Sequence, residues 1–168
     1  MDETLPTSPM PRLLAWLDEM GIEYEVHEHE PSYTAAETAA AEGVDPRSFE
    51  KVIWVRTTSG GDALLVLDSE DHLDLAKAGD ALRSGRVKLV SEGELERLAP
   101  DCEAGAMPAV GRLFGIPTFA DYSVRDEPDV SFSAGSHRFA VRVDRAGWER
   151  AAGVAYVDLA AALWLEQD

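Results

Sequence analysis

The sequence lacks several features that would direct it toward particular classes of protein. It contains one cysteine, Cys102, so an intramolecular disulfide is impossible, and no cluster of cysteines and histidines has the spacing of a metal site. Cys102 lies between Asp101 and Glu103, whose carboxylates raise the pKa of a thiol and make it a poor nucleophile. No apolar run reaches the length of a membrane span. These absences favour a reduced, cytoplasmic protein without a metal or other cofactor and without a membrane partner.

Positive charge is also scarce. Lysine and arginine number 15 against 32 aspartates and glutamates, which gives a formal net charge of -17. This balance argues against a broad basic face for DNA or RNA, although a small basic pocket for one phosphate remains compatible with it. The glycine-rich patterns of nucleotide sites, Gly-x-x-x-x-Gly-Lys-Ser/Thr and Gly-x-Gly-x-x-Gly, are missing, and so is the Gly-x-Ser-x-Gly nucleophile elbow. We therefore expect no DNA partner.

The length and composition fit one globular domain. A chain of 168 residues with 45% hydrophobic residues is large enough for a substantial core. The first eleven residues contain three prolines and have neither the basic nor the apolar region of a signal peptide. We expect residues 1–11 to form a flexible N-terminal tail and residues 12–168 to form the domain.

Hydrophobic periodicity, capping residues and turn residues predict a mixture of helices and strands. Helices are expected over residues 11–20, 34–42, 71–81, 92–98, 144–152 and 159–165. Strands are expected over residues 22–26, 52–56, 63–67, 88–90, 118–122, 130–132, 139–143 and 155–157. The strands occur in hairpin pairs more often than in strict strand–helix–strand alternation. The predicted fold is therefore an α/β single domain with a mixed, largely antiparallel sheet surrounded by helices.

Lys51 lies at the entry to the most apolar of these strands, in which four of the five residues from Val52 to Arg56 are apolar. An ammonium group is costly to bury without a partner, so a lysine at this position needs either water or an anion. The residues leave two interpretations open: a solvated lysine at the end of a strand, or an anion-binding group at the rim of a pocket.

Three further segments could contribute to such a pocket. Two are turns containing glycine, residues 105–111 and 133–137, and the third is the helix start at Thr34, where Glu37 completes a capping box. Glycine lets a ligand approach the backbone closely and frees N–H groups to bind an oxygen, but each turn could also be a tight turn with no ligand. His27 and His29 fall on one face of a strand; no third ligand accompanies them, so we expect no metal site.

Five motifs, in this order, resemble the YbaK / prolyl-tRNA-synthetase-associated editing domains, which are freestanding aminoacyl-tRNA deacylases. The resemblance covers approximately residues 13–152. The motifs are Gly21-Ile-Glu-Tyr24 followed by His29 and the Thr34 helix start, Lys51 within Phe49-Glu-Lys-Val-Ile-Trp54, Gly105-Ala-Met-Pro-Ala-Val-Gly111, Asp121 after an Ile-Pro strand, and Phe132-Ser-Ala-Gly-Ser-His-Arg138.

The resemblance implies hydrolysis of the ester between a small mischarged amino acid and the terminal adenosine of a tRNA, with water as nucleophile and no cofactor. It implies the 3′ end of an aminoacyl-tRNA as partner, and the formal net charge of -17 suggests either a contact with that end alone or help from an aminoacyl-tRNA synthetase as a second partner. It assigns Lys51 to the tRNA 3′ end, and Gly105 and Gly135 to the turns that form the oxyanion site. The substrate-binding residues that it implies are His27, His29, Thr34, Met107, Pro108, Ala109, Asp121, Ala134, Ser136 and His137.

The chain departs from the family pattern at three positions and in its charge. Ala109 replaces the second proline of the loop, Ser133 replaces an asparagine, and Val52 replaces a threonine found in some members. Two alternatives follow: a non-catalytic binding module for a tRNA end, a nucleotide or a synthetase, and an acidic structural domain without a ligand. The structural alternative predicts that Lys51, Gly105 and Gly135 lie far apart.

Overall fold

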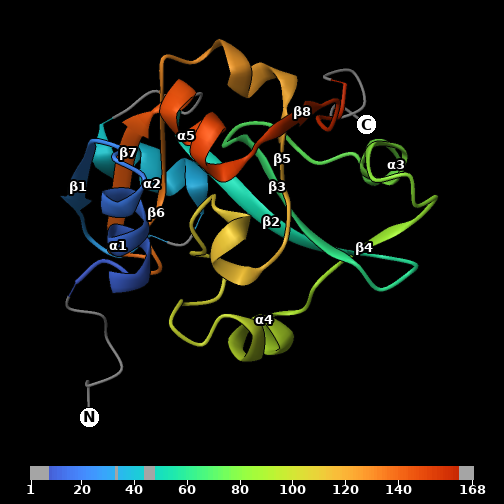
Figure 1. Ribbon diagram of the computed structural model, residues 1–168, viewed down its shortest axis with the longest axis horizontal. Helices are drawn as coiled ribbons and strands as arrows, with labels where there is room; N and C mark the ends of the chain where they lie inside the picture. Colours follow the sequence, from blue (N-terminus) through green and yellow to red (C-terminus); the bar gives the residue numbers. More distant parts are fainter. Residues whose placement is uncertain (1–7, 33, 44–47, 163–168) are drawn as a thin grey trace.

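The computed structural model describes residues 8–32, 34–43 and 48–162, and its strands form two sheets (Figure 1). The first sheet is antiparallel, with strand order β1-β7-β6. It consists of β1 (Tyr24–Glu28), β6 (Asp129–Ser133) and β7 (Phe139–Asp144). The second sheet has the order β4-β2-β3-β5-β8. It consists of β2 (Glu50–Thr57), β3 (Asp62–Asp68), β4 (Val87–Leu89), β5 (Thr118–Asp121) and β8 (Ala155–Val157).

The second sheet is mixed, as the sequence predicts. Strands β4, β2 and β3 pair antiparallel, whereas β3, β5 and β8 pair parallel. The α/β single-domain class is confirmed, but the strands divide between two sheets where the sequence suggests one. A single bridge between Phe49 and Ser131 joins the two sheets just before β2 begins.

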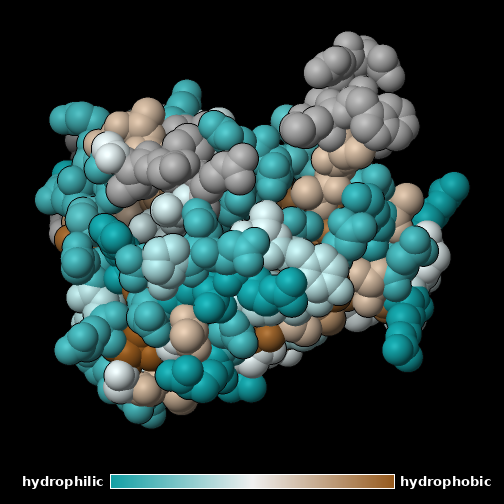
Figure 2. Space-filling view, turned by 90° about the horizontal axis from the view of Figure 1, so that it is seen from above, coloured by the Kyte–Doolittle hydropathy of each residue, from teal (hydrophilic) through white to brown (hydrophobic). Residues whose placement is uncertain are grey.

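The described residues contain five α-helices. They are α1 (Pro11–Glu19), α2 (Ala35–Glu42), α3 (Leu75–Ala81), α4 (Glu92–Leu98) and α5 (Arg145–Ala152). In Figure 1, α1, α2 and α5 lie near the three-stranded sheet and α3 lies near β4. Leu95 of α4 belongs to a core cluster with Trp54 of β2 and Leu64 of β3. Hydrophilic residues dominate the face shown in Figure 2. Within the described ranges, no helix combines the length and the apolar composition that crossing a membrane requires.

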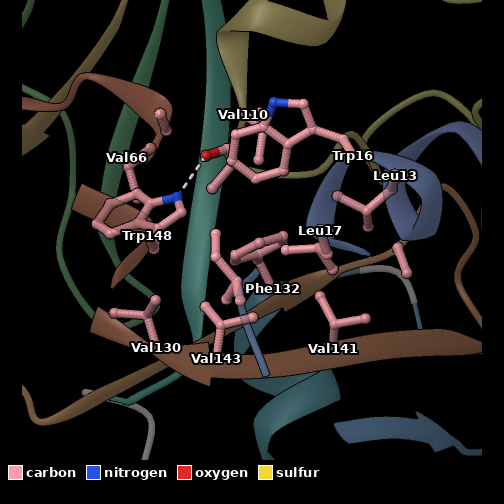
Figure 3. Packing of buried hydrophobic residues seen from close by; sticks show 14 of the residues in the cluster. Leu13, Trp16, Leu17, Val66, Val110, Val130, Phe132, Val141, Val143 and Trp148 are labelled. Atoms are coloured by element: carbon pink, nitrogen blue, oxygen red, sulfur yellow. Dashed lines mark hydrogen bonds between the residues drawn. The ribbon is translucent and has the colours of Figure 1, made fainter. Parts of the chain in front are cut away.

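The largest core cluster packs α1 and α5 against β6 and β7. Trp148 of α5 and Phe132 of β6 are fully buried, and Leu13 and Leu17 contribute the inward face of α1 (Figure 3). The indole N–H of Trp148 donates a 2.7 Å hydrogen bond to the carbonyl of Ala109, so a polar atom inside the core is satisfied. This bond fixes the loop before η2, a 3₁₀ helix over Gly111–Phe114, against the core.

Two predicted helices differ from the structure. Helix α3 begins at Leu75 rather than at residue 71, because the Asp74 carboxylate accepts hydrogen bonds from the backbone N–H groups of Ala76 and Lys77 and caps the helix there. Leu73 pairs instead with Ala160 in an isolated bridge. The helix predicted over 159–165 is wrong for residues 159–162, which are not helical, and residues 163–165 lie outside the described residues.

The end of the expected N-terminal tail belongs to the fold. Met10 is 3% exposed and its backbone N–H donates to the carbonyl of Ala134 at 2.9 Å, and Pro11 opens α1. Residues 1–7 lie outside the described part of the chain.

Candidate functional site

A cavity of about 280 Å³ lies where the start of β2, the start of α2 and both glycine turns meet. It contains five residues expected at the site, namely Thr34, Lys51, Gly105, Met107 and His137. The rest of its lining consists of Ser32, Thr38, Glu50, Val52, Ser69 and Ser133. Segments that are distant in the sequence therefore converge on one hollow, which is contrary to what a domain without a ligand site predicts.

The two glycine turns form one continuous wall. The N–H of Gly135 donates to the carbonyl of Ala106 at 2.9 Å, and the Gly135 carbonyl accepts from the N–H of Glu103 at 2.8 Å. The Glu103 carboxylate accepts from the backbone N–H of His137 at 2.7 Å. Both Gly105 and Gly135 have positive φ, +83° and +88°, which side chains rarely allow. Because the Gly135 N–H is already bonded, Gly135 shapes the wall, whereas Gly105 lies on the cavity lining.

Lys51 lies at the edge of the cavity and is half-buried. Its ammonium donates a hydrogen bond to the backbone carbonyl of Asp71, in the loop that follows β3. Antiparallel pairing places Lys51 opposite Leu67 of β3, so the strand register holds the lysine beside the cavity. A cationic group at this edge is suited to an anionic part of a ligand.

Glu50 is the lining residue that sequence reasoning missed. It is 2% exposed, and apart from a contact with the Asp68 carboxyl group its carboxylate oxygens have no hydrogen-bond partner in the described residues. Burial, followed by the charge of Asp68, raises the pKa of Glu50 well above its usual value. Asp68 is its partner in the β2–β3 register and is also buried; burial is the main cause that raises the pKa of Asp68 to about 6. A hydrogen bond between these carboxyl groups requires that they share a proton.

Hydroxyl groups line the α2 side of the cavity. The Thr38 hydroxyl donates to the carbonyl of Thr34 at 2.9 Å, so Ser32 is the donor in the 2.8 Å contact between the hydroxyls of Ser32 and Thr38. The Thr34 hydroxyl accepts the N–H of Glu37, which confirms the predicted capping box. With Val52 and Met107 as its apolar part, this lining suits a small ligand that carries both polar and apolar groups.

His27 and His29 are not among the described residues that line the cavity. Instead, both contact Glu42 of α2, His27 through Nδ1 at 3.5 Å and His29 through Nε2 at 3.6 Å. They therefore share one face, as the alternating pattern predicts. In the described part of the chain, no group of three or more histidine, cysteine, aspartate or glutamate residues has the arrangement that could hold a metal ion.

Asp121 is buried and is not among the residues that line the cavity; it organises backbone instead. Its carboxylate accepts N–H groups of Leu159, Ala160 and Ser123 at 2.8, 2.9 and 3.1 Å. Burial raises the pKa of Asp121, but these hydrogen bonds outweigh burial, and the net pKa is lowered. Asp121 is thus an ionised anchor for the segment after β8.

The remaining expected residues do not line the cavity but are close in sequence to residues that do. Pro108 and Ala109 are buried beside Met107, and the Ala109 carbonyl accepts the Trp148 indole. The Ala134 carbonyl accepts the Met10 N–H, and the Ser136 hydroxyl accepts the N–H of Arg138 at 2.9 Å. A larger surface hollow of about 810 Å³ is lined by the end of α1, the loop after it and residues of β1, β6 and β7, and it contains none of the expected site residues.

Comparison with known families matches residues 29–151 to the aminoacyl-tRNA editing domain. This match covers more than half of the chain, and the chain therefore belongs to the aminoacyl-tRNA editing domain family. A search of curated proteins finds no match.

Solved structures share the fold. A proposed trans-editing enzyme for prolyl tRNA synthetase superposes with a TM-score of 0.81 and 23% identity, over 94% of this chain and 100% of that chain. A hypothetical protein superposes with a TM-score of 0.80 and 20% identity, over 89% of this chain and 99% of its own. At these identities the likeness shows the fold alone.

Proposed function

We propose that the protein is a trans-editing deacylase that hydrolyses the ester between a small mischarged amino acid and the terminal ribose of a tRNA. The observation that carries this proposal is the convergence of Lys51, the Gly105 turn and the Thr34 helix start on one cavity of about 280 Å³. Membership of the editing-domain family supports the same reaction class.

The reaction requires few catalytic groups from the protein. Water attacks the ester carbonyl carbon, a tetrahedral oxyanion forms, and the bond from that carbon to the ribose oxygen breaks. The ribose oxygen takes a proton and the free amino acid leaves. Backbone N–H groups at the Gly105 turn stabilise the oxyanion, and Lys51 binds the phosphate-bearing 3′ end. The small cavity excludes larger side chains, which is the sieve that editing requires.

The partner of this site is the 3′ end of an aminoacyl-tRNA. The formal net charge of -17 is unfavourable for broad contact with the tRNA body. A synthetase that holds the tRNA body would compensate, so we propose an aminoacyl-tRNA synthetase as a second partner.

Deacylation of charged tRNA tests the proposal. We expect release of label from at least one of alanyl-, seryl- or cysteinyl-tRNA, and we expect Lys51→Ala to lower kcat/KM by about 10- to 100-fold, the effect of losing one or two charge-assisted contacts. Lys88→Ala is the matched control, because Lys88 is an exposed lysine of β4 away from the cavity. No release from any of the three, with Lys51→Ala indistinguishable from wild type, would contradict the proposal.

A second candidate function is a non-catalytic module that binds a tRNA end, a nucleotide or a synthetase. Ala109 in place of the family's second proline and the acidic composition favour it. Binding of a non-hydrolysable aminoacyl-tRNA mimic, without turnover of the esters above, would select this function.

A further inference from the structure

The Glu50 carboxyl group is the most unusual feature of the cavity. It lines the cavity, it is almost fully buried, and apart from the proton that it shares with Asp68 it has no hydrogen-bond donor in the described part of the chain. Buried polar atoms are nearly always hydrogen-bonded, because a missing partner leaves the cost of desolvation uncompensated. A ligand that brings N–H donors to this position would remove that cost.

The surroundings of Glu50 favour a cationic ligand. Asp68 faces Glu50 from β3, and Asp71 and Glu127 add negative charge from the loops after β3 and before β6. Lys51, the next residue of β2, donates a hydrogen bond to the Asp71 carbonyl, and no cation of the described residues is among the groups that mainly set the pKa of Glu50. An ammonium that approaches Glu50 replaces the proton shared with Asp68, which is released to solvent, and the ionised pair then neutralises the ligand cation. With Lys51 also on the lining, a ligand that has an ammonium at one end and phosphates at the other matches both charges.

We propose that Glu50 binds the α-ammonium group of the aminoacyl ester, and this inference rests on the proposed function. An α-ammonium offers three N–H donors, of which two can bond to the Glu50 oxygens and the third can bond to a hydroxyl of the α2 side, such as that of Ser32. Asp68 stands behind Glu50 and adds to the negative potential without lining the cavity.

This assignment gives the cavity a second form of selection in addition to size. An ester whose α-nitrogen is acylated, as in peptidyl-tRNA, has no ammonium and cannot satisfy Glu50. An α-hydroxy acid ester of the same size has one donor and no charge. The enzyme would therefore spare tRNAs that carry growing peptides while it removes free amino acids.

Paired substrates that differ only at the α-position test the inference. Alanyl-tRNA is compared with lactyl-tRNA, and seryl-tRNA with glyceryl-tRNA. We expect the wild-type protein to favour the amino ester by about 10- to 100-fold in kcat/KM, the range for hydrogen bonds to a charged group. Glu50→Gln, which keeps the shape and removes the charge, is expected to reduce that preference to within about two- to threefold, because most of the charge-assisted contribution is lost.

Glu96→Gln is the matched control, because Glu96 is an exposed glutamate of α4 that neither lines the cavity nor acts on Glu50, and it should preserve the preference. Equal hydrolysis of amino and hydroxy esters by the wild-type protein overturns the inference and leaves the deacylase proposal standing. A wild-type preference that Glu50→Gln retains in full overturns it as well. Failure of the wild-type protein to release any acyl group overturns the proposed function. The comparison of amino and hydroxy esters with the wild-type protein needs no variant, so it tests the inference even if Glu50→Gln folds poorly.

Discussion

Glu50 and Asp68 together make the folded protein bind protons that the unfolded chain releases. Burial raises both pKa values, that of Asp68 to about 6 from an ordinary 3.8, and that of Glu50 well above 4.5. Between about pH 4 and the raised pKa values, the folded state therefore holds more protons than the unfolded state. Under this condition the free energy of unfolding falls as pH rises, so this pair destabilises the ligand-free protein most at neutral and higher pH.

Glu50→Gln should remove most of this effect. The variant is expected to gain stability relative to wild type as pH rises from about 4 to about 7, by on the order of 1–3 kcal/mol, the cost of a buried group without a partner. Urea denaturation of both proteins at several pH values measures the difference, and taking the difference cancels carboxylates with lowered pKa values, such as Asp62 and Asp121. A stability difference that stays constant with pH would show that Glu50 ionises normally.

The sequence identifies Lys51 but not Glu50, and the reason is physical. A lysine at the entry to an apolar strand stands out on local chemistry alone. A glutamate beside it resembles any charged residue at a strand end, and its burial becomes visible only when the β2–β3 register places Asp68 opposite it. That register could have been tested from the predicted hairpin, which pairs the strands on either side of the turn at residues 57–62.

Gly135 shows how one position holds two elements together. Its φ is +88°, and a Cβ there would lie 2.8 Å from the Cβ of Met10, which precedes α1. The turn after β6 therefore supports the start of the first helix on one side and the Gly105 wall of the cavity on the other.

Gly135→Ala should be more destabilising than Gly115→Ala. Both glycines have positive φ, so each substitution costs about 1–2 kcal/mol of backbone strain. Only Gly135 also meets Met10, and displacing this side chain adds about 1–3 kcal/mol, whereas nothing lies within 4 Å of a Cβ at Gly115. Denaturant titration of the two variants measures the difference between their free energies of unfolding. Equal losses of stability would show that the Met10 side chain moves aside at no cost.

Patterns among neighbouring residues predict most of the helices and strands. The elements that these patterns miss depend on pairing between distant parts of the chain. The capping box at Thr34 and the hairpin of β2 and β3 depend on neighbouring residues and were visible in the sequence. Apolar spacing over residues 159–162 predicts a helix, but Asp121, His72 and Asp74 hydrogen-bond to the backbone of residues 159–161 from distant parts of the chain and hold this segment out of a helix. The division of the strands into two sheets likewise depends on partners that periodicity does not reveal.

The net charge of the whole molecule limits how extensively it can contact a nucleic acid. The formal net charge is -17, and hydrophilic residues cover most of the face in Figure 2. Several of the cations are already paired with carboxylates on the surface. These are Arg12 with Asp101, Arg56 with Asp62 and Glu94, Lys77 with Asp158, Arg138 with Glu28, Arg142 with Asp129, and Arg145 with Glu149. Because 32 acidic residues outnumber 15 basic ones, and six of the basic ones are paired in this way, the surface is poorly suited to follow a tRNA backbone beyond its 3′ end.

Because of this distribution of charge, we expect KM to depend only weakly on salt and the rate of hydrolysis to depend only weakly on tRNA length. If Lys51 alone neutralises a phosphate, the slope of log affinity against log salt should be about -0.7, the single-strand value for one contact. Raising salt from about 50 to about 200 mM should then change KM only about two- to threefold, whereas six to ten contacts would weaken binding by about a thousandfold or more. An acylated minihelix that contains only the acceptor stem should be hydrolysed about as well as the full tRNA. Steady-state kinetics on both substrates across the salt series measure this, and a steep slope, or loss of activity on the minihelix, would show that the protein contacts the tRNA body despite its acidic surface.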